Sequence, residues 1–409
     1  MIGMKPLLHK ISNSYRKNKD DLRALLLGGY PQFVFRNLDR LPQDQIPIFT
    51  FHGVSAGYFE AQLRYLAENG YRTLDGDELH ALMVGKTKAA RNGVVLTFDD
   101  GRSSLWSTAY PLLKKYGLRA IAFILPGHIA EGSVYWPSLE DVWAGRVGLE
   151  EVEQREPVAP LCSWREIQQM QSSGVIDFQS HTSYHHSVFV KDRLVDFINP
   201  SFQASYLTST LYPAIRREGR DVFPESLELG FPIYAWAPAM TAARRYLEDE
   251  ELSTACTSFV DQNGGPAFFE QGGWRKMLKN FSDDYSKQNG NSGRFLTFQE
   301  RAAEVRRDLA ESKTVIEARL GKPVQHLCYP WYAGSEIAVQ ISKEVGYSCN
   351  YWGILGRRAV NRIGGDPYHL ARMNDNYIYS LPGKGRTALY ELLIQKMNSV
   401  VYADSPPYG

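Results

Sequence analysis

The chain has 409 residues, which is enough for one large α/β domain with an insertion or for two domains. Apolar residues make up 44% and charged residues 22%, the composition of a soluble globular protein. The formal net charge of +1 argues against a general nucleic-acid-binding protein, so we expect no nucleic acid among its partners.

The N-terminal segment is more basic than the rest of the chain. Residues 1–40 contain eight Lys or Arg and three Asp. We interpret residues 1–44 as a basic N-terminal extension, either solvated or in weak contact with an anionic membrane surface. Because no long apolar stretch follows the first lysine, we expect no secretory signal. The expected location is cytoplasmic, or peripheral at the inner membrane face.

From residue 46 onward, apolar runs typical of strands alternate with helix-like patterns. This order predicts βαβ units and a parallel sheet, with functional residues at the carboxyl ends of the strands. The predicted strands are 46–51, 94–98, 119–125, 175–180, 326–329 and 347–352. The predicted helices are 58–68, 104–116, 163–174, 298–320 and 336–344.

A long stretch in the middle of the chain interrupts this alternation. Residues 191–297 are rich in aromatic residues, Pro and Gly, and we predict that they fold as an inserted subdomain. Its aromatic side chains should mostly form a core, with Trp236 or Trp274 as a candidate platform for a sugar ring. The predicted barrel then consists of residues 45–190 and 298–395, followed by a C-terminal tail at 396–409.

Two short motifs stand at the ends of predicted strands. Residues 96–101 read LTFDDG, and residues 180–185 read SHTSYH. Aspartate and histidine are ligands that suit a catalytic zinc-like ion. An aspartate next to a ligand aspartate is well placed to act as a general base on water bound to that ion. The pair of motifs therefore predicts a metal-dependent hydrolase.

These motifs resemble those of the polysaccharide deacetylase family (NodB homology, carbohydrate esterase family 4). The sequences FHGV at 51–54 and YPW at 329–331 belong to the same resemblance. It implies an α/β fold with a distorted (β/α)7-type barrel and removal of an acetyl group from a carbohydrate. It also implies one divalent ion, zinc before nickel or cobalt. By position, Asp100, His181 and His185 would bind the ion, and Asp99 would be the general base.

Other site residues are assigned from the resemblance and from their places at strand ends. His52, Tyr329 and Trp331 are predicted to line the substrate pocket, and the backbone N–H of Trp331 would stabilise the negative oxygen of the intermediate. The family's third motif usually begins with an arginine that orients the base, but this chain has Cys328 there. Arg372 is our candidate substitute and pocket residue.

The catalytic acid is the residue that the family pattern leaves least defined. His369 is the only late histidine and is our candidate, although it precedes Leu370 instead of following a leucine. His52 is the alternative.

The predicted function is removal of an acetyl group, most naturally N-acetyl, from a nucleotide-linked, lipid-linked or oligosaccharide substrate. Two alternatives remain open. The first is a deformylase or amidohydrolase acting on a non-polymer substrate. The second is an inactive carbohydrate-binding protein, which the intact Asp99 disfavours.

Overall fold

The computed structural model describes residues 23–87, 91–201, 213–217, 220–223, 227–354 and 360–402. The chain forms two compact units. The first comprises Met1–Thr182, Ser312–Tyr332 and Gly346–Gly409, and the second comprises Ser183–Glu311 and Ala333–Val345. The insertion predicted at 191–297 falls inside the second unit.

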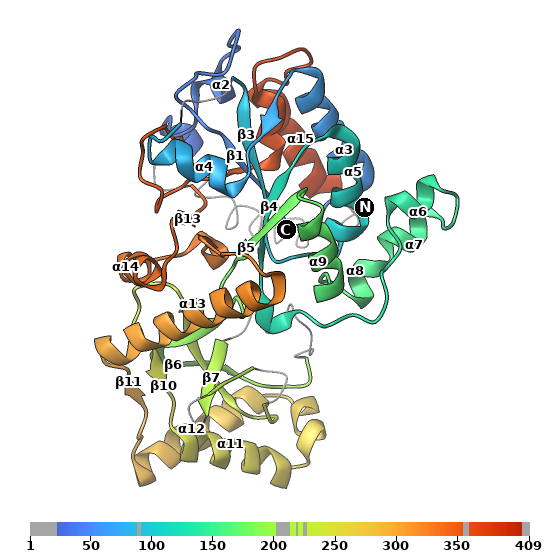
Figure 1. The fold of residues 1–409 in the computed structure, drawn as a ribbon. Coiled ribbons are helices and arrows are strands. Elements are labelled where there is room, and N and C mark those ends of the chain that lie inside the picture. Colours follow the sequence, from blue (N-terminus) through green and yellow to red (C-terminus); the bar gives the residue numbers. More distant parts are fainter. Residues whose placement is uncertain are drawn as a thin grey trace. The chain divides into compact units, whose positions relative to one another are not determined.

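The first unit contains a parallel sheet with the strand order β13-β12-β5-β4-β3-β1-β14, and β2 pairs with β3 (Figure 1). Every strand pair in it is parallel. The seven strands of this order form an α/β half-barrel, with β2 as an eighth strand off the path, and this arrangement confirms the predicted fold class. The strands are β1 (Ile48–Phe51), β2 (Arg72–Thr73), β3 (Gly93–Phe98), β4 (Ala120–Ile124), β5 (Ile176–Ser180), β12 (His326–Cys328), β13 (Cys349–Tyr351) and β14 (Met373–Asn374).

A single segment near the C-terminus pairs with strands at both ends of this order, β13 at one end and β1 next to β14 at the other. Tyr351 of β13 forms a parallel bridge with Leu370, and the Trp352 N–H donates to the Leu370 carbonyl at 2.8 Å. Three residues later, Met373 of β14 pairs with Phe49 of β1. The short segment between these pairings is thereby brought to the carboxyl ends of the strands.

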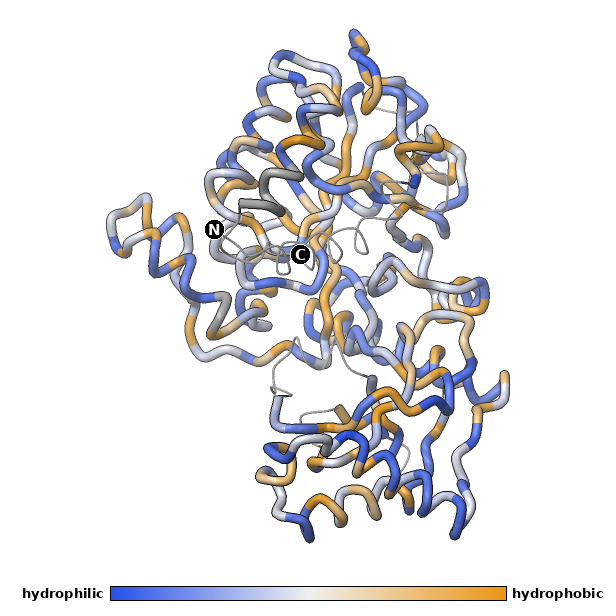
Figure 2. Tube along the Cα trace, turned by 180° about the vertical axis from the view of Figure 1, so that it is seen from behind, coloured by the Kyte–Doolittle hydropathy of each residue, from blue (hydrophilic) through white to orange (hydrophobic). Residues whose placement is uncertain are grey.

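Helices cover the sheet because their apolar faces match its buried strands. All six residues of β3 are buried, as expected for a strand covered on both faces. Ser163 and Glu166 form a capping box at the start of α9, the helix predicted at 163–174. In Figure 2, hydrophobic colour is concentrated along the strands, while the helices alternate between hydrophobic and hydrophilic residues.

The helices that lie wholly within the first unit are α2 (Gln32–Phe35), α3 (Ala56–Glu68), α4 (Gly76–Met83), α5 (Tyr110–Tyr116), α6 (Leu139–Trp143), α7 (Leu149–Glu153), α8 (Arg155–Val158), α9 (Trp164–Ser172) and α15 (Leu389–Tyr402). Short 3-10 helices are η2 (Pro126–His128), η5 (Pro330–Tyr332) and η6 (Asp375–Ser380). The helix predicted at 104–116 begins as a π-helical turn, η1 (Leu105–Ala109). Helix α15 continues past residue 396, where we predicted a tail.

The second unit is built on a four-stranded sheet with the order β8-β7-β6-β9 and a two-stranded sheet, β10-β11. Its strands are β6 (Ser187–Phe197), β7 (Pro213–Arg217), β8 (Arg220–Val222), β9 (Pro232–Pro238), β10 (Tyr246–Leu247) and β11 (Arg294–Phe295). Its helices are α11 (Glu250–Gln262), η4 (Gly265–Glu270), α12 (Trp274–Asn289) and α14 (Glu336–Val345), together with the first part of α13 (Phe298–Leu320).

Aromatic side chains fill the core of the second unit, as the composition predicted. One cluster centres on Phe189 and Tyr234 at the sheet. Another, between α11 and α12, includes Phe268 and Trp274. Trp274 is thus a core residue, whereas 37% of Trp236 is exposed.

Among the described residues, no helix combines the length and apolar character needed to cross a membrane. Residues 1–22, which carry much of the predicted basic extension, lie outside the described part of the chain.

Candidate active site

Asp99 and Asp100 directly follow strand β3, at the carboxyl end of the parallel sheet. The Asp99 N–H donates to the Phe51 carbonyl at 2.9 Å, which continues the β1–β3 pairing one residue beyond the strand. The Asp99 side chain is 2% exposed. Burial of a carboxylate is costly unless hydrogen bonds and an opposite charge compensate for it.

Arg372 supplies that compensation. Its Nη1 donates to Asp99 Oδ1 at 2.7 Å, and its Nη2 donates to Oδ2 at 2.8 Å. The other donors are used as well, since Nε reaches the Trp352 carbonyl, Nη1 the Thr97 hydroxyl and Nη2 the Cys328 sulfur. All five N–H donors of a guanidinium therefore have acceptors here. Arg372 is a rigid, fully buried support for Asp99.

The charges around Asp99 set its protonation state. Burial is the largest influence and acts to raise its pKa, but the positive charge of Arg372 and the hydrogen bonds that it donates outweigh burial, so that the pKa of Asp99 is lowered. Burial raises the pKa of the adjacent Cys328 thiol well above its usual value, which keeps the thiol protonated. Asp99 is therefore an ionised carboxylate, as a general base must be.

Asp100 follows β3, and His181 follows β5, which is the next strand but one in the sheet. The two side chains face each other. Asp100 Oδ1 lies 3.6 Å from His181 Nε2, and Asp100 Oδ2 accepts from Arg102 Nε at 3.4 Å. His181 Nδ1 lies 2.9 Å from the Cys328 carbonyl. Burial lowers the pKa of His181, which favours its neutral imidazole.

This geometry fits a metal ion. In a neutral imidazole whose Nδ1–H donates to a carbonyl, Nε2 carries a lone pair, and here that lone pair faces a carboxylate oxygen. A cation between the two would turn an unfavourable pairing into coordination, and the carbonyl behind the ring would fix its orientation. Zinc sites use this donor chemistry.

Two sets of buried side chains contain enough donors for an ion. Asp99, His181 and Cys328 each offer a ligand atom within 4.8 Å of the others. Asp100, His181 and His185 form the second set. His185 follows His181 by four residues and belongs to the segment that begins the second unit.

The backbone around these residues adopts an uncommon conformation. Left-handed φ angles are rare outside glycine and gather at functional sites, where the surrounding structure must maintain them. In the described part of the chain, Asn92 has this conformation away from the motifs, and the other nonglycine residues that have it lie in the motifs or next to them: Asp100, Thr182, His185, Trp331 and Tyr332.

The two candidate histidines for the acid role have different surroundings. His52 Nε2 lies 4.0 Å from Asp99 Oδ2, and a third of its side chain is exposed. His369 Nδ1 is bound to Asp366 Oδ2 at 2.6 Å, and its ring stacks on Trp352 with centroids 5.5 Å apart. His52 therefore lies at ion-pair distance from the predicted base, whereas His369 is bound to Asp366.

The third motif contributes an inner and an outer aromatic residue. Tyr329 is fully buried, and its hydroxyl accepts from Asn350 at 2.9 Å. Trp331 is 38% exposed in the 3-10 turn η5. Next to it, the Tyr332 ring covers the Arg372 guanidinium, 5.2 Å from the ring centre.

Two of these contacts were not predicted from sequence. Cys328 was noted only as the residue in place of the family's arginine, yet its sulfur lies 3.8 Å from both Asp99 oxygens. Tyr332 was not singled out at all. The signal for Cys328 was its place in the motif, because a small side chain there leaves room for an arginine from the segment that precedes β14.

Comparisons with known proteins agree with this site. The sequence model of the polysaccharide deacetylase family matches residues 86–209, which carry both the LTFDDG and SHTSYH motifs. Over these residues the chain is similar to this family, which is of the NodB-like carbohydrate esterase type.

Individual relatives match over shorter segments. The chain is 36% identical to YxkH of Bacillus subtilis (strain 168) over 89 residues, which are 20% of this chain and 32% of YxkH. It is 26% identical over 137 residues to the poly-β-1,6-N-acetyl-D-glucosamine N-deacetylase of Staphylococcus aureus (strain MRSA252), covering 34% of this chain and 39% of that protein. The chain thus spans well under half the length of these relatives.

Solved structures show weaker similarity over more of the chain. The deacetylase domain of BpsB from Bordetella bronchiseptica has a TM-score of 0.48 at 15% identity, covering 82% of this chain and 97% of that one. A de-N-acetylase from Aggregatibacter actinomycetemcomitans has a TM-score of 0.47 at 16% identity, covering 81% and 96%.

Proposed function

We propose that the protein is a metal-dependent deacetylase that removes an N-acetyl group from a carbohydrate or glycan precursor. The observation that carries the proposal is the Asp99 carboxylate, which is buried, ionised and held by Arg372 beside the Asp100–His181 pair. A binding protein would not need a buried charge maintained next to its metal ligands. Such an arrangement costs folding free energy and is typical of catalytic bases.

In this proposal Asp100, His181 and His185 hold one divalent ion, with zinc preferred to nickel or cobalt. When bound, the ion would act as a Lewis acid toward the acetyl carbonyl and acidify water. Asp99 takes the proton from the attacking water, and Arg372 keeps Asp99 oriented and ionised. The backbone N–H of Trp331 donates to the oxygen that becomes negative.

Departure of the amine requires a proton. We propose His52 as its donor because it is not assigned to the ion and its Nε2 lies 4.0 Å from Asp99 Oδ2. A base and an acid this close together can act in succession on one substrate. The base takes a proton from the attacking water, and the acid then gives a proton to the leaving amine. The earlier candidate, His369, is the alternative that mutation has to test.

The proposal is tested by measuring divalent ions per purified chain together with acetate release. Substrates should include N-acetylglucosamine oligomers, a nucleotide-linked N-acetyl sugar and a lipid-linked one. We expect about one ion in the wild type and almost none in His181→Ala, with acetate release only from the former. Formate release from formylated analogues without acetate release would favour a deformylase. A chain that binds no zinc, nickel or cobalt would contradict the proposal.

We further propose a cytoplasmic location, with residues 1–40 contacting an anionic membrane surface. The basic composition of this segment is its support. The chain without residues 1–22 should associate less with anionic vesicles than the full chain at low salt. Equal association of both chains would rule out this role.

A further inference from the structure

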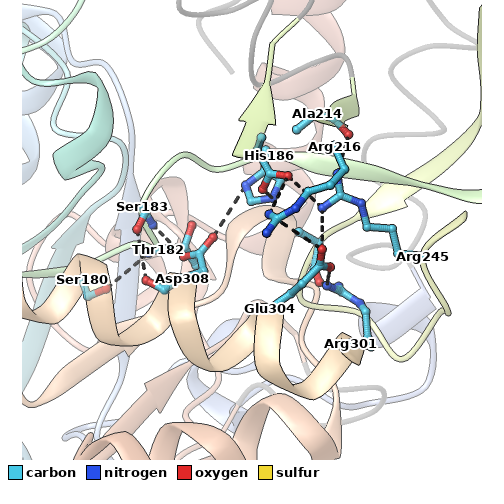
Figure 3. Close-up of polar contacts among 12 residues, drawn as sticks. Ser180, Thr182, Ser183, His186, Ala214, Arg216, Arg245, Arg301, Glu304 and Asp308 are labelled. Carbon is cyan, nitrogen blue, oxygen red and sulfur yellow. Dashed lines mark hydrogen bonds and ion pairs between the residues drawn. The ribbon is translucent and has the colours of Figure 1, made fainter. Parts of the chain in front are cut away.

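A buried network of charged side chains holds the turn that carries His185. Within the second unit, the Ser183 N–H donates to Asp308 Oδ1 at 2.9 Å, and the Ser183 hydroxyl donates to the Asp308 carbonyl at 3.0 Å. Figure 3 shows Asp308 on α13 pointing toward this turn. Asp308 thus binds the residue two positions before His185.

The same carboxylate also reaches the residue after His185. His186 Nδ1 lies 3.7 Å from Asp308 Oδ2, while His186 Nε2 lies 3.6 Å from Asp221 Oδ2 on the other side of the ring. The His186 carbonyl accepts from the Ala239 N–H at 3.0 Å. The turn 183–186 is therefore fixed at both ends, with His185 between them.

Arginines support the carboxylates of this network in turn. Arg245 is 2% exposed and donates to Asp221 at 2.9 Å, to Glu304 at 3.1 Å and to the Ala214 carbonyl at 3.2 Å. Glu304 lies one helical turn before Asp308 on α13 and also accepts from Arg301 at 3.2 Å. The network is continuous from α13 to the strands of the second unit (Figure 3).

The backbone of the turn needs such support. His185 has φ of 52°, in the left-handed region that a nonglycine residue adopts only when its surroundings enforce it. The cavity among Ser183, His186, Asp308 and the arginines measures about 40 Å³, which accommodates a water molecule but not a sugar. The network is therefore suited to holding a conformation and not to binding a substrate.

We propose that Asp308 is a positioning residue that presets His185 for the metal ion by holding Ser183 and His186 on either side of it. This inference rests on the proposed function, in which His185 is a ligand. Groups that orient metal ligands are worth roughly 10–100-fold in metal affinity. Asp308 should therefore raise the metal affinity by roughly 10–100-fold without contacting the ion.

The test is the zinc dissociation constant, measured by competition with a chelating indicator. Asp308→Ala should bind zinc about 10–100-fold more weakly than the wild type. Asp308→Asn keeps an oxygen that can accept from the Ser183 N–H and should remain closer to the wild type than Asp308→Ala. Zinc affinity unchanged in a folded Asp308→Ala protein would overturn the proposal.

A matched control is Asp249→Ala in the same unit. Asp249 is buried and also accepts from backbone N–H groups, those of Glu251 and Leu252 at the start of α11. Its loss should lower the melting temperature and leave zinc affinity unchanged. If both variants weaken zinc binding equally, Asp308 is merely structural.

Two further variants separate this proposal from the proposed function. His185→Ala should lose zinc affinity, and if it does not, the ligand assignment itself is wrong. Weak binding by His185→Ala with normal binding by Asp308→Ala would defeat only the positioning role. Should Asp308→Ala not fold, His186→Ala removes the other contact of the turn, and wild-type zinc affinity there would overturn the proposal equally.

Discussion

One guanidinium holds both carboxylate oxygens of Asp99, because Arg372 donates to Oδ1 from Nη1 and to Oδ2 from Nη2. The two residues are 273 positions apart in the chain and both are buried. In such a pair, each group keeps its charge in the interior because of the other.

Removing the positive charge in Arg372→Met should raise the pKa of Asp99. A carboxylate next to an arginine typically has its pKa lowered by roughly one to three units, so the variant should lose that shift. Because the base works only when ionised, the acid limb of the pH profile of kcat/KM should move to higher pH. Arg372→Lys keeps the positive charge but cannot donate to both carboxylate oxygens at once, so it should move the acid limb less.

The chain offers a matched control for that substitution. Arg155 and Glu166 form a second buried bidentate pair, at 2.8 and 2.7 Å. Arg155→Met should reduce stability by about 3–5 kcal/mol, as for any broken buried pair. Its pH profile should keep the wild-type acid limb. A common shift in both variants would mean that the limb reports stability and not Asp99.

Asp99→Asn should retain zinc yet lose turnover. General base catalysis is worth roughly 10²–10⁴-fold, so kcat should fall by about that factor. Acetate release and metal content are measured on the same preparation. A near wild-type rate in this variant would show that another group is the base.

The two histidine candidates can be compared directly. His52→Gln should lower kcat on an N-acetyl sugar by roughly 10²–10⁴-fold, whereas His369→Gln should change it little. An activated ester such as p-nitrophenyl acetate needs no proton on its leaving group and should restore most of the His52→Gln rate. The reverse ranking of the two variants would return the acid role to His369.

Stability should depend on His326 in a defined pH range. Burial lowers the pKa of this fully buried histidine to about 4. Since its unfolded pKa is about 6.5, the unfolded state binds the proton first, and stability present above about pH 6.5 is lost as the pH falls toward 4. The full shift corresponds to about 3 kcal/mol. Urea unfolding of His326→Gln at pH 7 and pH 5 should show a smaller difference than the wild type.

Much of the first unit could be predicted from local pattern. Helix α13 was predicted over 298–320 and runs over Phe298–Leu320. The predicted strand at 94–98 differs from β3 by a single residue. Helix α13 ends at a clear stop signal, Gly321, and β3 is a continuous apolar run, so little depends on distant parts of the chain.

What could not be predicted depends on long-range contacts. Nothing near Asp308, in the middle of a charged helix, indicates that it binds a turn 125 residues earlier. The strands of the second unit have weak alternation, and β6 has register shifts against β9 between Phe189 and Asp196. Arg372 could be named as a candidate, but its acceptors lie on β3, on β12 and on the residues that follow β3 and β13, which only folding brings together.

The long separation between Asp99 and Arg372 also has a consequence for protein synthesis. A ribosome completes the Asp99–Asp100 motif long before it adds the segment that joins β13 to β14. Until Arg372 arrives, Asp99 has no guanidinium to keep it ionised in the interior, and the sheet lacks its last strand. Chains that end before Arg372 should therefore release no acetate, even though the LTFDDG and SHTSYH motifs are both present.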